Sequence, residues 1–135
     1  MNTFKGTISS IESHDSFRLV EVDINGEPMK LITLELDERF HERANVLLLV
    51  KETDIVIAKN RSGTLSIENK YPCSISGVNS GEVFSEIAID SPLGAMTALV
   101  GRSAQDSMKL EPDDRIQVFI RANEIALMEN KIEDK

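Results

Sequence analysis

The sequence predicts an all-β protein built from two tandem five-stranded barrels, each with one short helix. The main observation is an internal repeat: the segment 4–11 returns at 71–78, shifted by 67 positions, and the segment 46–57 returns at 116–127, shifted by 70. Short stretches of alternating apolar and polar residues, typical of half-buried strands, fill both copies. Turn residues separate these stretches at matching places. Each copy is therefore expected to form one structural module.

In the first copy, alternation and turn residues predict five strands, with a short helix before the fourth. Asn25-Gly26 is a strong signal for a two-residue hairpin turn between the second and third strands. The polar stretch 37–43 begins with Asp37, a candidate helix N-cap, and predicts one or two helical turns. The strands are expected at 7–11, 17–24, 29–36, 45–51 and 53–58.

The second copy repeats this order with three additional residues. The stretch 90–94 supplies the turn between the second and third strands. Ser103 opens a helical stretch that runs to Leu110, with Asp106 in a capping arrangement and Pro112 ending it. The strands are expected at 74–78, 83–89, 95–100, 115–121 and 123–129. Three strands, a short helix and two strands are the order of a small OB-like barrel.

The repeat divides the chain into a first domain at 1–62 and a second at 66–130. Modules of roughly 60–70 residues bury little surface, so each is expected to dock or to oligomerise. No run of about 18 apolar residues is present, and we therefore expect no membrane span. The N-terminal residues begin a strand pattern, unlike a signal peptide. The single cysteine, Cys73, cannot form an internal disulfide, and these features together predict a cytoplasmic protein.

The composition is acidic, with 15 Lys and Arg against 23 Asp and Glu and a formal net charge of −8. A general attraction to a nucleic-acid backbone is therefore not expected. Single-stranded nucleic acids also need aromatic stacking platforms, and the chain has one Tyr, five Phe and no Trp. The sequence thus disfavours nucleic acid as a partner, and predicts that any bound anion is held by a local group of donors.

The sequence predicts neither an enzyme nor a metal site. The two histidines, His14 and His41, occupy non-equivalent places in the repeat and lack the spacing of metal ligands. Cys73 has no partner in a C-x-x-C motif, so we interpret it as a buried structural thiol. The sequence contains neither a G-x-x-x-x-G-K-[ST] nor a G-x-G-x-x-G phosphate loop.

One repeated motif has the chemistry of a binding site: a cation followed two residues later by a small polar residue, between the last two strands. It comprises Lys51 and Thr53 in the first copy, and Arg121 and Asn123 in the second. A cation and a hydroxyl or amide at a tight bend can present several donors to one anion. The alternative interpretation is a solvated basic residue at the end of a hairpin.

A second motif, Ser66-Ile67-Glu68-Asn69-Lys70, precedes the first strand of the second copy. With the basic turns, it makes the repeat resemble the molybdate-binding Mop or TOBE domain of molbindins over nearly the whole chain. In that family a Ser-Ala-Arg-Asn segment precedes the first strand, and a Lys-Ala-Ser/Thr turn joins the last two. The resemblance implies an OB-like barrel and an oxyanion site where two domains meet.

The resemblance also implies the ligand and its site. The ligand would be molybdate or tungstate, with no catalytic cofactor, bound for storage, homeostasis or delivery to molybdenum-cofactor metabolism. Because family sites lie between domains, a homo-oligomer is expected. The implied site residues are Ser66 and Asn69 combined with Lys51 and Thr53, or with Arg121 and Asn123 of a neighbouring copy.

Three departures from the family pattern favour an alternative function. Glu68 stands where the family has arginine, only Asn2 remains of the segment before the first copy, and Asn123 replaces a hydroxyl. The alternative is an oligomerising regulatory or interaction module whose anion sites are degenerate and which docks onto a molybdate transporter or regulator.

Overall fold

The computed structural model describes residues 1–131 as ten strands, one α-helix and two single-turn 3-10 helices. The first repeat contains β1 (Asn2–His14), β2 (Phe17–Ile24), β3 (Glu27–Thr33), β4 (Asn45–Val50), η1 (Glu52–Asp54) and β5 (Val56–Ala58). The second repeat contains β6 (Asn69–Ser80), β7 (Phe84–Ser91), β8 (Gly94–Gly101), α1 (Arg102–Met108), β9 (Arg115–Ile120), η2 (Ala122–Glu124) and β10 (Ala126–Glu129).

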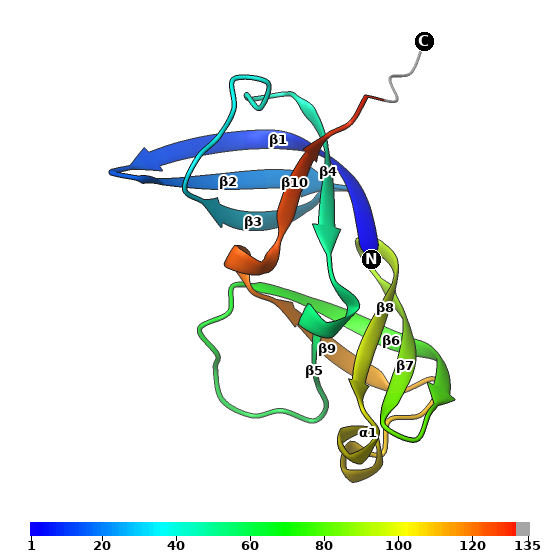
Figure 1. Ribbon diagram of the computed structural model, residues 1–135. Helices are drawn as coiled ribbons and strands as arrows, with labels where there is room; N and C mark the ends of the chain where they lie inside the picture. The colour runs from blue at the N-terminus through cyan, green and yellow to red at the C-terminus, as the bar shows by residue number, and fades with distance from the viewer. Residues whose placement is uncertain (132–135) are drawn as a thin grey trace.

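The two repeats exchange their last strands. One sheet has the order β10-β4-β1-β2-β3 and the other the order β5-β9-β6-β7-β8 (Figure 1). Leu127 of β10 pairs with Leu48 of the first repeat, and Ile57 of β5 pairs with Val118 of the second. The predicted all-β architecture of two five-stranded barrels is confirmed, but each barrel takes one strand from the other repeat. The domain boundaries 1–62 and 66–130 describe the sequence repeats and stay a prediction.

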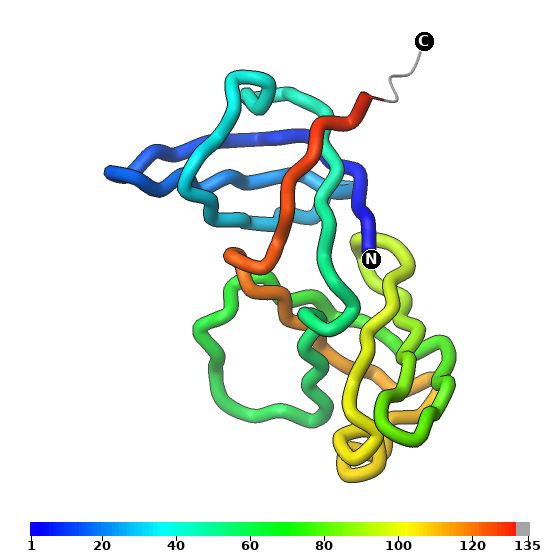
Figure 2. Tube along the Cα trace, in the orientation of Figure 1, coloured from blue at the N-terminus to red at the C-terminus, as the bar shows by residue number. Residues whose placement is uncertain are grey.

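At the predicted bend between the last two strands of each repeat, the chain passes from one barrel to the other instead of turning back as a hairpin (Figure 2). In η1 the N–H of Asp54 donates to the carbonyl of Lys51, and in η2 the N–H of Glu124 donates to that of Arg121, both at 3.0 Å. The backbone is extended on both sides of each turn, so the chain continues into the opposite barrel. Ile55 follows η1 and is buried, which fixes the crossing in the core.

Within the described residues, an α-helix forms only in the second repeat. It begins at Arg102, one residue earlier than predicted, and Lys109 ends it in a left-handed conformation with φ 53°. The helix predicted at 37–43 was wrong, because this shorter segment forms two separate turns, in which Phe40 donates to Asp37 and Ala44 to His41. No helix between residues 1 and 131 has the length and apolar character that crossing a bilayer requires.

Two asparagines join the barrels in equivalent ways. Asn69 Nδ2 donates to the carbonyl of Lys30 at 2.7 Å, and the N–H of Lys30 donates to Asn69 Oδ1 at 2.8 Å. Asn2 makes the same pair of hydrogen bonds with Thr97, at 2.9 and 2.8 Å. Both asparagines are buried. Each amide thus satisfies the backbone at the free edge of the other barrel's third strand, where an unpaired group would be costly.

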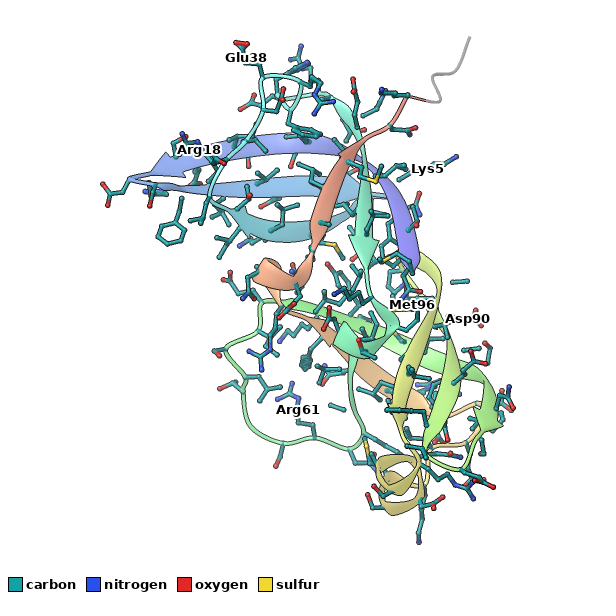
Figure 3. The ribbon with its side chains drawn as sticks, in the orientation of Figure 1. Lys5, Arg18, Glu38, Arg61, Asp90 and Met96 are labelled. Carbon is teal, nitrogen blue, oxygen red and sulfur yellow. The ribbon has the colours of Figure 1, made fainter. Side chains whose placement is uncertain are left out.

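The connector between β5 and β6 is fastened to the outside of the second barrel. Lys59 Nζ donates to the carbonyl of Lys109 at 2.6 Å and to Asp114 Oδ2 at 2.8 Å. The Arg61 guanidinium lies 5.1 Å from the Phe119 ring centroid and donates to Gln117 Oε1 (Figure 3). These contacts hold the first part of the connector, at Lys59 and Arg61, against the barrel.

We predict that Asn69→Asp lowers the free energy of unfolding by about 2 kcal/mol, because the Lys30 carbonyl loses its donor and faces a carboxylate. Asn2→Asp should do the same through Thr97. Urea unfolding at neutral pH measures both effects. The control is Asn45→Asp, since Asn45 uses only Oδ1, as an acceptor from Thr7. Equal stabilities of the Asn69 and Asn45 variants would show that the hydrogen bonds between Asn69 and Lys30 are dispensable for stability.

A second prediction concerns Asp114, whose carboxyl pKa is held below its ordinary value, first by the hydrogen bond from Lys59 and then by the Glu111 N–H. A lowered folded-state pKa stabilises the fold above the unfolded-state value, and this stabilisation is lost as the pH falls through the folded-state value. Asp114→Asn should therefore lower the thermal midpoint at pH 7, and its difference from wild type should shrink below about pH 4. A difference between Asp114→Asn and wild type that stays constant from pH 7 to pH 3 would contradict this prediction.

Candidate functional site

The two basic turns lie at the boundary between the barrels. The turn η1 lies against β8, and η2 lies against β3. Four predicted residues sit on these turns with exposed side chains: Lys51, Thr53, Arg121 and Asn123. Because the strand exchange carries each turn across the boundary, each basic residue lies between its own barrel and the other one.

Strand pairing groups the predicted residues into two equivalent positions. Asn69 pairs with Ile120, so it lies beside Arg121, which follows directly. In the same way Asn2 pairs with Val50 and lies beside Lys51. We call these the Asn69 position (Asn69 and Arg121, with Ser66 and Asn123 nearby along the chain) and the Asn2 position (Asn2 and Lys51, with Thr53 nearby along the chain).

Within one chain, then, the register brings Asn69 to Arg121 and keeps Lys51 with Asn2. A combination of Ser66 and Asn69 with the basic turn of a neighbouring copy stays a prediction. The Asn69 amide already joins the two barrels, since its Oδ1 and one Nδ2 hydrogen bind the backbone of Lys30. Among the described residues, Asn69 Nδ2 donates this one hydrogen bond, although the amide carries two hydrogens.

A hollow of about 410 Å³ opens beside Asn69. It is lined by residues of β3, of the connector and of the start of β6, which include Pro28, Lys30, Leu65, Glu68, Asn69 and Lys70. Lys30 Nζ lies 3.9 Å from Glu68 Oε2. The lining of the hollow therefore includes two lysines and one glutamate, next to the Asn69 amide.

Lys30 is a residue that sequence reasoning missed. It belongs to the other repeat and lies 39 positions from Asn69. The alternation in β3 gave a partial signal, since Met29 and Leu31 are buried and Lys30 between them faces outward. Nothing local indicates that Lys30 faces the segment before β6, because that neighbour results from the exchange.

The Asn2 position has a different charge arrangement. The amino group of Met1 contacts the Glu52 carboxylate, and this hydrogen bond lowers the pKa of that carboxyl. Thr97 lies opposite Asn2 where the other position has Lys30. The two positions are thus alike in backbone geometry and unlike in the side chains they offer.

Two buried groups near the boundary are structural. The Tyr71 hydroxyl donates to the carbonyl of Pro28 at 2.8 Å, and burial raises its pKa. Burial also raises the pKa of the Cys73 thiol to about 11, so the thiol stays protonated and unreactive, as expected for a structural cysteine. In residues 1–131, no group of three or more His, Cys, Asp or Glu side chains is placed to hold a metal ion.

A second, larger hollow of about 700 Å³ lies on the first barrel between β3 and β10. Its lining is mainly apolar and includes Phe17, Ile32, Leu34, Phe40 and Leu127, with Asn123 on its border. Phe17, Ile32 and Leu34 are exposed. Asn123 thus lies between this apolar groove and the boundary that carries Arg121.

Comparison with known proteins agrees with this architecture. Residues 65–127 match the TOBE domain family. The chain is 31% identical over 115 residues to the molybdenum transport protein ModE of Herbaspirillum seropedicae, covering 81% of this chain and 43% of that one. It is 24% identical over 119 residues to the molybdenum import ATP-binding protein ModC of Brucella abortus (strain 2308), covering 87% and 32%. The chain therefore spans less than half the length of these curated relatives.

A solved structure extends the comparison to the whole fold. The cytoplasmic molybdate-binding protein ModG, crystallised with molybdate bound, superposes with a TM-score of 0.87 at 21% identity, over 96% of each chain. At this identity the likeness establishes the fold. The TOBE match covers the second repeat, and the chain as a whole shares the tandem-barrel fold of that solved structure, as the resemblance of its motifs predicted.

Proposed function

We propose that this chain binds a tetrahedral oxyanion, molybdate or tungstate, without covalent chemistry. The Asn69 position carries the proposal, because an amide at the barrel boundary, a basic turn and two lysines gather there in a chain of net charge −8. The tandem fold shared with a protein crystallised with molybdate supports the choice of anion.

The chemistry of the ligand fits these groups. A tetrahedral dianion has four acceptor oxygens and needs a shell of N–H and O–H donors with a few cations close by. The Ser66 hydroxyl, the second N–H of Asn69 and the Arg121 guanidinium would supply donors, while Lys30 and Lys70 would supply charge. At the Asn2 position, Lys51 and Thr53 offer a smaller set.

The exposure of the predicted residues supports a site shared between copies. Ser66, Arg121 and Asn123 are exposed, so a second copy of the chain could bury them around the anion. A homo-oligomer would exclude water from the site and strengthen every hydrogen bond to the ligand. We propose storage or delivery of the anion in the cytoplasm as the role of such an assembly.

The apolar groove on the first barrel favours a second candidate function. Phe17, Ile32 and Leu34 expose apolar surface beside the edge strand β3, as expected of a docking face. An interaction module that docks onto a molybdate transporter or regulator would use this face and would not need the anion site.

We predict that isothermal titration shows tight binding of molybdate to wild type, with sulfate as the comparison anion and native mass spectrometry giving the stoichiometry. Arg121→Met should weaken binding about tenfold or more, because a charge-assisted hydrogen bond is lost. Lys51→Met tests the Asn2 position in the same way. Arg18→Met, at the far end of the β1–β2 hairpin, is the matched control and should bind as wild type does (Figure 3).

One result of the titration and mass spectrometry would contradict the proposal. A folded protein that releases no heat with molybdate or tungstate, and carries no anion in native mass spectra, would rule out the oxyanion-binding function. The docking function would then become the leading interpretation.

A further inference from the structure

Glu68 is the one carboxylate that lines the hollow beside Asn69, where it lies close to the Lys30 ammonium. We propose that Glu68 is a built-in competitor of the bound oxyanion: its carboxylate neutralises Lys30 in the free protein, and a dianion replaces it. This inference rests on the proposed function and assigns a specificity role to two residues, Lys30 and Glu68, that belong to different repeats.

The backbone of Lys30 is held firmly. The Asn69 amide binds both its N–H and its carbonyl oxygen, at 2.8 and 2.7 Å, so the start of its side chain is fixed at the mouth of the hollow. The side chain is 38% exposed, which leaves the ammonium accessible to a ligand. Glu21 of β2 lies opposite Lys30 in the strand register and is the other acidic neighbour in the first barrel.

The carboxylate of Glu68 is held loosely in comparison. Its side chain is 74% exposed, and the 3.9 Å separation from Lys30 Nζ is longer than a hydrogen bond. Exposed ion pairs of this kind contribute little to stability. An incoming anion can therefore displace Glu68 into solvent without disturbing the fold.

This competition favours doubly charged anions. The Coulomb attraction of Lys30, Lys70 and Arg121 for an anion doubles when the anion carries two charges instead of one. A monoanion such as nitrate only replaces one carboxylate charge by another and gains little. A tetrahedral dianion brings a second charge and more acceptor oxygens, and it can displace Glu68. Glu68 is thus a specificity-determining residue that acts against monoanions.

Two substitutions test this assignment by titration calorimetry with molybdate and with nitrate. Glu68→Gln should tighten molybdate binding about fivefold to twentyfold and should allow detectable nitrate binding, because the competitor and its repulsion are removed. Lys30→Met should weaken molybdate binding about tenfold. In the Lys30→Met background, Glu68→Gln should gain clearly less than in wild type, because Glu68 no longer competes for the ammonium.

Matched controls separate this role from a general charge effect. Glu38→Gln and Lys5→Met change the same charges on exposed residues elsewhere on the first barrel and should bind as wild type does (Figure 3). Lys30→Met leaves the backbone partner of Asn69 in place, and Lys30→Gln is a second variant should the first fold poorly. Urea unfolding verifies that each protein is folded.

The outcomes distinguish the inference from the proposed function. If wild type binds molybdate and Glu68→Gln binds it with unchanged affinity, the competitor is overturned while the oxyanion function stands. The same holds if Glu68→Gln gains as much in the Lys30→Met background as in wild type. If neither wild type nor any variant binds molybdate or tungstate, the proposed function fails and the inference fails with it.

Discussion

The reciprocal exchange of the last strand is the constraint on which the rest of this molecule depends. Each barrel is closed on one side by a strand from the other repeat, so neither repeat can satisfy its own sheet alone. The exchange draws the start of β6 to the edge of β3 and the start of β1 to the edge of β8, where Asn69 and Asn2 bind Lys30 and Thr97. It also sends η1 and η2 through the boundary. Both the Asn69 position and the Asn2 position therefore result from the exchange of the last strand between the repeats.

The same arrangement deals with the free edges that a five-stranded open barrel leaves. Unpaired strand edges invite association with other chains, and proteins usually cover them. At Lys30 and at Thr97, one asparagine amide takes the place of a neighbouring strand, donating one hydrogen bond and accepting another. On the first barrel the remainder of the β3 edge adjoins an apolar groove, whereas the second repeat carries α1 between β8 and β9. The two barrels share a backbone plan and differ in how much of their surface is left for other molecules.

Sequence reasoning predicted most of the fold and only part of the candidate site, for physical reasons that particular residues illustrate. Alternation fixes which face of a strand is buried, so the strands around Leu48 and Val118 were predicted correctly. Alternation does not determine which strand lies alongside, because a hairpin and a strand exchange bury the same residues. The buried Ile55 and Ile125 are compatible with either arrangement. An aspartate such as Asp37 can cap a turn as well as a helix. The segment after it is three residues shorter than in the second repeat, and it forms turns instead of a helix. The basic turns were visible as local motifs, whereas Lys30 required knowledge of contacts between repeats.

The negative net charge of the molecule opposes the binding of any anion. A net charge of −8 repels a dianion at long range, but salt screens this field over about 8 to 10 Å. At the hollow the nearest charges matter most, and its lining has two lysines and one glutamate, whose side chain is 74% exposed. An acid in an anion site is therefore compatible with binding when it can leave, and its departure costs about as little as an exposed ion pair contributes. In the proposed site, Glu68 would then help to distinguish dianions from monoanions instead of abolishing binding.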